Sequence, residues 1–358
     1  MVRLQGPKSS ASSSPDTARR RVVVVLGAGG PVGHAFHAGV LAALGEEGWD
    51  GRSADLLVGT SVGAITAALL RAGLSPADLF AYATDRPLSE EGAALLEKGW
   101  PDTGFHIDLA QRRRRGPSSA PGLLAELVRS PHHVRVGLIM AALAPTGEVA
   151  TDVIIDGFGR LLGPLWPQAP LLVPAVDLDV GTRMVFGAPG APRTEPGRAV
   201  AASCAVPSYF IPVDIAGRRY VDGGLFSPSN TDLVGAHGGH YDAVVTSVPM
   251  GIGGWPHRRG LDLPGRLTNQ RAAQRGLRSQ RRSGVAMATF APGPAELQVM
   301  HYDAFELDHL SQIAHRAAAA TRLRLRRDPT LRPLTEILRD HAATSSTAET
   351  GFGAGIPT

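Results

Sequence analysis

A serine flanked by glycines is the part of this sequence best suited to nucleophilic chemistry. Ser61 is the centre of a G-x-S-x-G motif from Gly59 to Gly63, between the apolar run 56–58, which follows Asp55, and a helix-forming stretch to about Ala72. Such a turn between strand and helix presents its serine to solvent at the carboxyl end of a sheet, and the two glycines leave room for it. Free backbone N–H groups at the helix start favour a developing negative charge. A small-residue turn that only packs is the alternative.

A glycine-rich loop lies one strand earlier. The β-branched run 22–26 predicts a strand buried on both faces of a parallel sheet, and residues 27–33 follow it. Gly29 and Gly30 can direct backbone N–H groups to the carboxyl ends of the strands, where α/β folds bind ligands. With the N–H of Val62 they are candidate donors to an oxyanion. The remaining glycines of the loop are Gly27 and Gly33.

The same loop also resembles a dinucleotide-binding fingerprint. Its spacing is G-x-G-x-x-x-G, however, and the second strand lacks the acidic residue that normally ends it, because Asp50 and Asp55 both precede that strand. A nicotinamide-dependent oxidoreductase is therefore the less favoured alternative.

Asp222 is the candidate general base. It closes a strand that begins near Arg218, and Gly223 and Gly224 follow it. A hydroxyl is a weak nucleophile near neutral pH and needs an adjacent proton acceptor. A carboxylate in a partly desolvated site has a raised pKa and can accept that proton. The alternative is an aspartate that only stabilises a turn.

Histidine and cysteine provide no clear additional site. A Ser-His-Asp triad needs a late histidine in a strand-end loop, but the late candidates lie in or beside predicted helices; they are His301, His309 and His315. No spacing indicates a metal site. The one cysteine, Cys204, excludes an intramolecular disulfide and a Cys-based zinc cluster. We expect chemistry without a metal or an organic cofactor.

Composition and charge limit the class of protein. The chain has 358 residues, 43 of them glycine, and a formal charge of +4, which suits a compact globular protein. This mild charge does not require nucleic acid, and no nucleic-acid-binding module is present. A basic face would equally meet anionic lipid. The arginine run 112–115 is typical of a solvated loop, with contact to lipid phosphates as the alternative.

The uncharged run 22–45 raises the question of a membrane span or a signal peptide. Pro31, His34 and His37 interrupt it, and its apolar core is short, so a buried strand followed by a helix explains it better. The expected location is the cytoplasm, with peripheral membrane contact as a further option.

Alternating strands and helices predict an α/β sandwich on a mostly parallel sheet. Residues 1–20 are expected to form a disordered leader and 21–327 one domain. Residues 328–358 are expected to form a C-terminal tail, disordered from about His341. The turn Ala216-Gly217 predicts a hairpin.

The order of these motifs resembles the patatin-like phospholipase family. The glycine loop, the G-x-S-x-G motif and Asp-Gly-Gly follow in that order, and residues 202–213 are similar to the family's approach to its catalytic aspartate. The resemblance covers Arg21 to about Arg326. It implies a three-layer patatin-like sandwich and a lipid acyl hydrolase, of phospholipase A or lysophospholipase type, with a Ser–Asp dyad. By position, Ser61 would be the nucleophile and Asp222 the base.

By the same resemblance, Gly29, Gly30 and Val62 would form the oxyanion hole. The loop departs from the family at two positions, with Ala28 in place of the first glycine and Val32 in place of a basic residue. A weakly active protein of the same fold that binds lipid or a protein partner is the second class of function. The sequence assigns neither head group, acyl chain nor oligomeric state.

Overall fold

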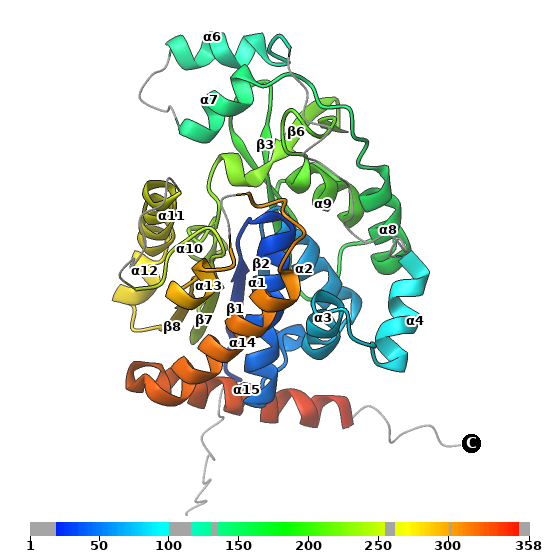
Figure 1. Ribbon diagram of the computed structural model, residues 1–358. Coiled ribbons are helices and arrows are strands. Elements are labelled where there is room, and N and C mark those ends of the chain that lie inside the picture. Colours follow the sequence, from blue (N-terminus) through cyan, green and yellow to red (C-terminus); the bar gives the residue numbers. More distant parts are fainter. Residues whose placement is uncertain (1–18, 100–115, 130–134, 255–261, 301–302, 351–358) are drawn as a thin grey trace, which may run out of the picture.

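One sheet organises the chain. The computed structural model describes residues 19–99, 116–129, 135–254, 262–300 and 303–350 (Figure 1). The strand order is β5-β6-β3-β2-β1-β7-β8, and β4 also pairs with β3. The strands are β1 (Val22–Leu26), β2 (Leu56–Gly59), β3 (Leu171–Asp177), β4 (Arg183–Phe186), β5 (Val213–Ile215), β6 (Arg218–Asp222), β7 (Ala243–Ser247) and β8 (Ala286–Phe290).

The sheet is parallel from β3 to β8 and antiparallel beyond β3. β1 lies in its centre, with parallel neighbours β2 and β7. Its five residues are fully buried, as an uninterrupted Val/Leu run predicts for a strand covered on both faces. The predicted hairpin is confirmed, because β5 pairs antiparallel with β6.

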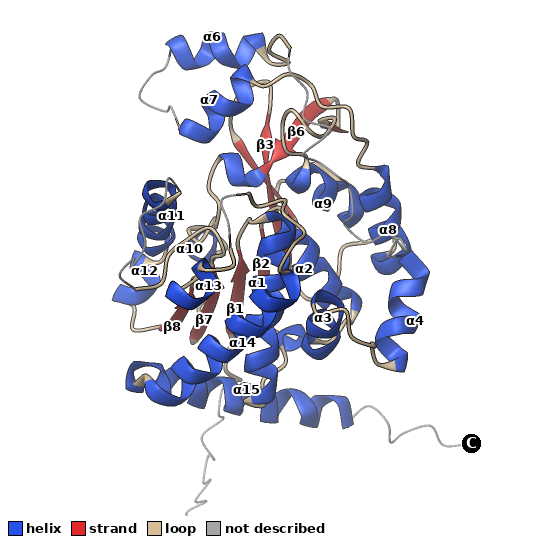
Figure 2. Cartoon of the chain, in the orientation of Figure 1, coloured by secondary structure: helices blue, strands red, loops and turns tan. Residues whose placement is uncertain are grey.

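Helices cover both faces of the sheet, as Figure 2 shows. On one face Val22, Val24 and Leu26 pack into a core that includes α1, α2, α9 and α14. On the other face Val23 and Val25 pack against α10 and Leu277. The major helices are α1 (Gly30–Glu46), α2 (Val62–Ala72), α3 (Pro76–Ala83), α4 (Glu90–Gly99), α6 (Pro121–Arg129), α7 (Val136–Leu143), α8 (Asp152–Leu162), α9 (Pro196–Cys204), α10 (Leu233–Ala236), α11 (Leu263–Gly276), α12 (Arg278–Arg282), α13 (Pro294–Leu297), α14 (Leu310–Arg327) and α15 (Arg332–Thr350).

The predicted three-layer α/β sandwich on a mostly parallel sheet is thus confirmed. None of the helices built from the described residues is both long and apolar enough to cross a bilayer. The predicted leader lies almost wholly outside the described residues, and so does the arginine run 112–115.

The C-terminal segment differs from the expected tail. α15 covers residues 332–350, and the side chain of His341, where disorder was expected to begin, is fully buried. Its Nδ1 accepts a hydrogen bond from Trp49 Nε1–H at 3.2 Å, and its Nε2 lies 3.1 Å from Asp55 Oδ2. Leu334 and Leu338 are buried on the same helix, at the spacing of an amphipathic face. The Thr- and Ser-rich composition concealed that face.

Candidate active site

Ser61 and Asp222 approach each other beside β3, the strand between β2 and β6. Val58 of β2 pairs with Leu172 of β3. β2 ends at Gly59, and Ser61 stands in the turn just beyond it, before α2. Ala175 pairs with Asp222 across the antiparallel partner β6. Residues 161 positions apart in the chain thus meet at the carboxyl edge of β2.

Ser61 adopts a strained backbone at the tight turn between β2 and α2. Its φ of 55° and ψ of −126° lie in a region that non-glycine residues rarely occupy. The surrounding structure holds it there: the Ser61 N–H donates to Ser203 Oγ at 3.0 Å, and the Ser203 hydroxyl donates to the Pro174 carbonyl at 2.7 Å. Ser203 on α9 thereby ties the turn to β3, a role that the sequence pattern does not reveal.

Ser61 is buried, whereas the sequence predicted a serine presented to solvent. Only 7% of its surface is exposed. The loop before α14 packs over the same edge, because the Val32 N–H donates to the Ala304 carbonyl at 3.4 Å. The Phe305 ring packs on Tyr209 with 5.2 Å between ring centroids.

The glycines beside Ser61 are required by close backbone approaches. A Cβ on Gly63 would overlap the carbonyl oxygen of Leu26, and a Cβ on Gly59 would lie 2.5 Å from the Cα of Ala64. At the other motif, a Cβ on Gly223 would overlap the Pro174 carbonyl, and one on Gly224 would lie 2.9 Å from Asp222 Oδ1. The glycines of both motifs thus allow strands, helix and loop to converge.

We expect Gly63→Ala to destabilise the fold by about 2–4 kcal/mol, because backbone must move to admit the methyl group. Gly159→Ala is the matched control: it lies inside α8 with open space around the built Cβ. There alanine should stabilise by about 0.5–1 kcal/mol through helix propensity. Urea unfolding followed by circular dichroism measures both, and equal effects would disprove the steric argument.

Asp222 has the environment of a general base. Its side chain is 5% exposed, and burial raises its pKa from 3.8 to about 6. The Ser61 hydroxyl and the Gly224 N–H, which donates to Oδ1 at 2.6 Å, oppose that rise. The Ser61 hydroxyl approaches closely enough to lower the pKa, but Oδ2 makes no hydrogen bond of ordinary geometry among the described residues. Oδ2 is thus the atom available to take a proton.

Asn230 connects the serine turn to the aspartate loop. It is fully buried with a left-handed φ of 46°. Its Nδ2–H donates to Thr60 Oγ1 at 3.1 Å and lies 3.5 Å from the Gly223 carbonyl, and its Oδ1 accepts from Arg183 at 2.8 Å. One amide therefore contacts the residue before Ser61 and the residue after Asp222. The turn-rich stretch 227–230 gave no sign of this.

The glycine loop is held against the same site. The Gly27 N–H donates to Ser247 O at 3.0 Å, and the Ala28 N–H donates to Pro228 O at 2.7 Å. Among the described residues, none accepts a hydrogen bond from the N–H of Gly29, Gly30 or Val62. Within the described residues, the three predicted oxyanion donors thus have no hydrogen-bond acceptor, whereas the N–H of Val32 donates to the Ala304 carbonyl.

Two of the described histidines contact the glycine loop and α2, and not Ser61. The His37 ring lies 2.8 Å from the Gly27 carbonyl and 2.8 Å from Ser247 Oγ, and burial lowers its pKa to about 3. His34 Nδ1 lies 3.0 Å from Thr66 Oγ1 on α2. Within the described residues, no histidine hydrogen-bonds to Ser61 or Asp222. Of the late candidates, His309 precedes α14, His315 packs on Phe80, and His301 lies outside the described residues.

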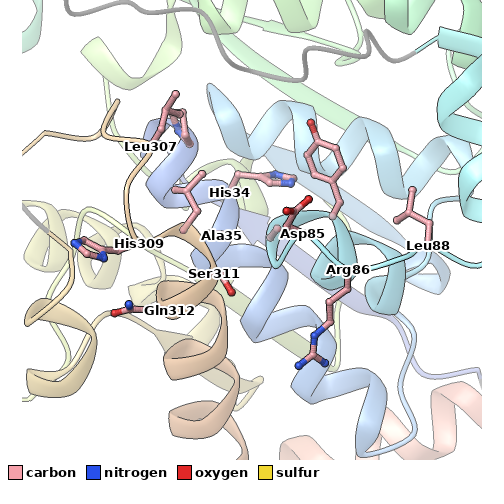
Figure 3. Close-up of a pocket in the computed structure, with 13 residues that line it drawn as sticks. His34, Ala35, Asp85, Arg86, Leu88, Leu307, His309, Ser311 and Gln312 are labelled. Carbon is pink, nitrogen blue, oxygen red and sulfur yellow. The ribbon is translucent and has the colours of Figure 1, made fainter.

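A cavity of about 630 Å³ opens beside the glycine loop (Figure 3). Pro31, His34 and Ala35 of α1 form one wall, and the end of α3 and the start of α14 form the others. Neither Ser61 nor Asp222, the two candidate catalytic residues, lines this cavity.

A second cavity of about 900 Å³ lies between α11, β8 and α14.

The comparisons with known proteins agree with the order of the motifs. The family model described as patatin-like phospholipase matches residues 24–234, which is more than half of the chain. No curated protein matches it. Solved structures to which it is similar include VipD from Legionella pneumophila, which is 13% identical with a TM-score of 0.35 and coverage of 85% of this chain and 66% of that chain.

Two further structures contain ExoU. The type III effector protein ExoU is 17% identical, with a TM-score of 0.29 and coverage of 93% of this chain and 62% of that one. The heterodimeric ExoU–SpcU complex from the type III secretion system of Pseudomonas aeruginosa is 19% identical, with a TM-score of 0.32 and coverage of 93% of this chain and 61% of that one. The chain thus spans slightly less than two thirds of the length of these proteins. On the family match over residues 24–234, this chain belongs to the patatin-like phospholipase family.

Proposed function

We infer that this protein is a lipid acyl hydrolase, a serine carboxylic-ester hydrolase that works through a Ser–Asp dyad. The observation that carries the proposal is the meeting of a strained serine turn with a buried aspartate whose pKa is raised to about 6. Membership of a phospholipase family supports a lipid ester as the substrate class. The same membership disfavours the dinucleotide alternative.

The reaction begins with proton transfer from Ser61 to Asp222. Asp222 Oδ2 takes the hydroxyl proton while Ser61 Oγ attacks the ester carbonyl carbon. The N–H groups of Gly29, Gly30 and Val62 stabilise the oxyanion of the tetrahedral intermediate. Its collapse breaks the bond to the alcohol, which leaves with the proton from Asp222.

The second half of the reaction hydrolyses the acyl-Ser61 ester. Asp222, again ionised, accepts a proton from water as the water oxygen attacks the acyl carbon. Collapse then releases the fatty acid, and the proton returns to Ser61. Each proton is accounted for by one carboxylate, so the cycle requires no histidine and no cofactor.

Ester hydrolysis and covalent labelling test the proposal together. The full chain is assayed on a soluble short-chain chromogenic ester and on phospholipid vesicles, then treated with a fluorophosphonate. We expect cleavage of the ester and a label on Ser61, located by peptide mass spectrometry. A folded protein that neither cleaves nor takes the label would be a binding protein on this fold, and a label on another serine would overturn the assignment.

We expect kcat/KM to rise with pH along a single acid limb centred near pH 6. The base must be ionised, and the raised pKa of Asp222 means that its ionised fraction falls below that value. Activity should drop about tenfold per pH unit well below the midpoint. Initial rates on the soluble ester between pH 4.5 and 8 measure the limb. A profile that stays flat down to pH 4.5 would exclude a carboxylate with this pKa as the base.

A further inference from the structure

The helices α11 and α12 carry an unusual concentration of positive charge. Residues 263–282 hold six arginines and neither aspartate nor glutamate. The first, Arg266, is buried and paired with Asp262 at 2.7 Å. The other five are exposed and form what we call the arginine face: Arg271, Arg275, Arg278, Arg281 and Arg282.

No carboxylate of the described residues neutralises the arginine face. Among those residues, none of the five arginines has an ion pair. The aspartates on the neighbouring loops are committed elsewhere, with Asp232 paired to Arg183 and Asp242 to Arg20. Glu296 lies along the same groove as Arg271 and Arg281 but is buried and accepts from the Gly293 N–H at 3.0 Å. The surface therefore presents uncompensated positive charge.

The opposite side of the two helices is fixed to the protein. Ala273 and Leu277 are buried, and Leu277 packs with the sheet. Figure 1 shows α11 and α12 on the flank of the molecule beside β8. The two helices are thus packed on the protein, while the arginine side chains of the arginine face are exposed to solvent. This arrangement suits a docking surface.

The start of α11, which carries the buried Arg266 and not the arginine face, contacts the segment beside the glycine loop. Arg266 Nη1–H donates to the Pro249 carbonyl at 2.9 Å and lies 3.3 Å from the Gly251 carbonyl. Pro249 packs against the glycine loop, since a Cβ on Gly29 would lie 3.0 Å from Pro249 Cβ. One buried arginine and one proline therefore separate α11 from the catalytic loop.

We propose that the arginine face docks on an anionic membrane surface. The proposal rests on the proposed function, because a lipid hydrolase must reach esters in a bilayer. Arginine binds phosphate through several N–H groups, and each basic residue near an anionic leaflet adds to the attraction. An acidic protein or a nucleic acid would meet the same charge, and the experiment separates these partners.

Vesicle co-sedimentation of the full chain is the test, in a Ser61→Ala background so that no lipid is consumed. The patch variant replaces Arg275, Arg278, Arg281 and Arg282 with glutamine. The control variant makes the same change at four exposed arginines elsewhere: Arg160, Arg193, Arg332 and Arg339. Both variants lose the same net charge, so any difference between them reports the position of the charge.

We expect the Ser61→Ala parent to bind vesicles containing about one third phosphatidylglycerol and not to bind vesicles of pure phosphatidylcholine. The patch variant should lose at least about tenfold in partition coefficient, and the control variant much less. With Ser61 restored, the patch variant should cleave a soluble ester at the parental rate.

An equal loss of vesicle binding in both variants, or a parent protein that does not bind anionic vesicles, would overturn the proposal. Tighter binding to random duplex DNA or to polyglutamate than to vesicles at the same salt concentration would replace the membrane with that partner. Because soluble-ester cleavage is measured separately, failure of the docking surface is distinguishable from failure of the proposed enzyme.

Discussion

Alanine in place of Ser61 is expected to lower ester hydrolysis at least about 10³-fold and to leave the fold intact. The hydroxyl is the proposed nucleophile, whereas the turn is held by the backbone: the Ser61 N–H donates to Ser203 Oγ, and the Thr60 N–H donates to Leu26 O. Both bonds persist in the variant. Rates on the soluble ester and unfolding in urea measure the two halves of this prediction.

A second buried serine is the matched control. Ser229 is 1% exposed, and among the described residues its hydroxyl has no hydrogen-bond partner. It lies in the loop between Asp222 and α10, outside the proposed machinery. Ser229→Ala should keep the rate within about twofold. Hydrolysis that survives Ser61→Ala would contradict the dyad, and a comparable loss in Ser229→Ala would show that the assay reports general damage.

Local sequence rules were sufficient wherever a strong pattern had one structural solution. The Val-rich run 22–26 could only be a strand covered on both faces, and the small residues between Gly59 and Gly63 mark a tight turn. The pairing of β3 with both β2 and β6 joins distant segments of the chain and is seen only in the structure. The fold class was predictable from local patterns, whereas the pairing of Ser61 with Asp222 was expected only from the resemblance to the family, and their catalytic roles stay proposals.

Contacts between distant polar side chains were beyond those rules. Ser203 and Asn230 support the two motifs through single hydrogen bonds across 142 and 170 positions of the chain, and no periodicity signals such a bond. The C-terminal helix was missed for a related reason: its stability comes from burial of Leu334, Leu338 and His341 against the domain. Composition, which argued for disorder, does not record a tertiary contact.

The contacts of the histidines also show a structural role and not a catalytic one. His37 is buried against the Gly27 carbonyl and Ser247, where a neutral imidazole satisfies two polar partners at once. A histidine required for catalysis would instead have to reach Ser61 or Asp222, and the described residues place none there.

Asparagine in place of Asp222 is expected to abolish the activity and to stabilise the protein at neutral pH. The amide cannot accept the Ser61 proton, so hydrolysis should fall at least about 10³-fold. The amide oxygen can still accept the Gly224 N–H that now binds Oδ1. The structural role of the side chain is therefore kept while its basicity is lost.

The stability gain follows from the pKa of Asp222. Its value is 3.8 for an ordinary aspartate and about 6 in the folded protein. Between these values the folded state binds the proton more tightly than the unfolded state, so the free energy of unfolding falls as pH rises. The ionised carboxylate thus costs about 1–3 kcal/mol above pH 6. Asparagine, which does not titrate, removes that cost.

Comparing the wild type with Asp222→Asn therefore separates a catalytic carboxylate from a structural one. Urea unfolding of the wild type and of Asp222→Asn at pH 4 and pH 7.5 should show a stability difference that appears only at the higher pH. If the negative charge of Asp222 instead stabilised the fold, its replacement by the neutral amide would destabilise the protein at pH 7.5, and the Ser–Asp proposal would lose its base. Inactivity combined with higher stability is the result expected of a buried carboxylate kept ionised for chemistry at the expense of the fold.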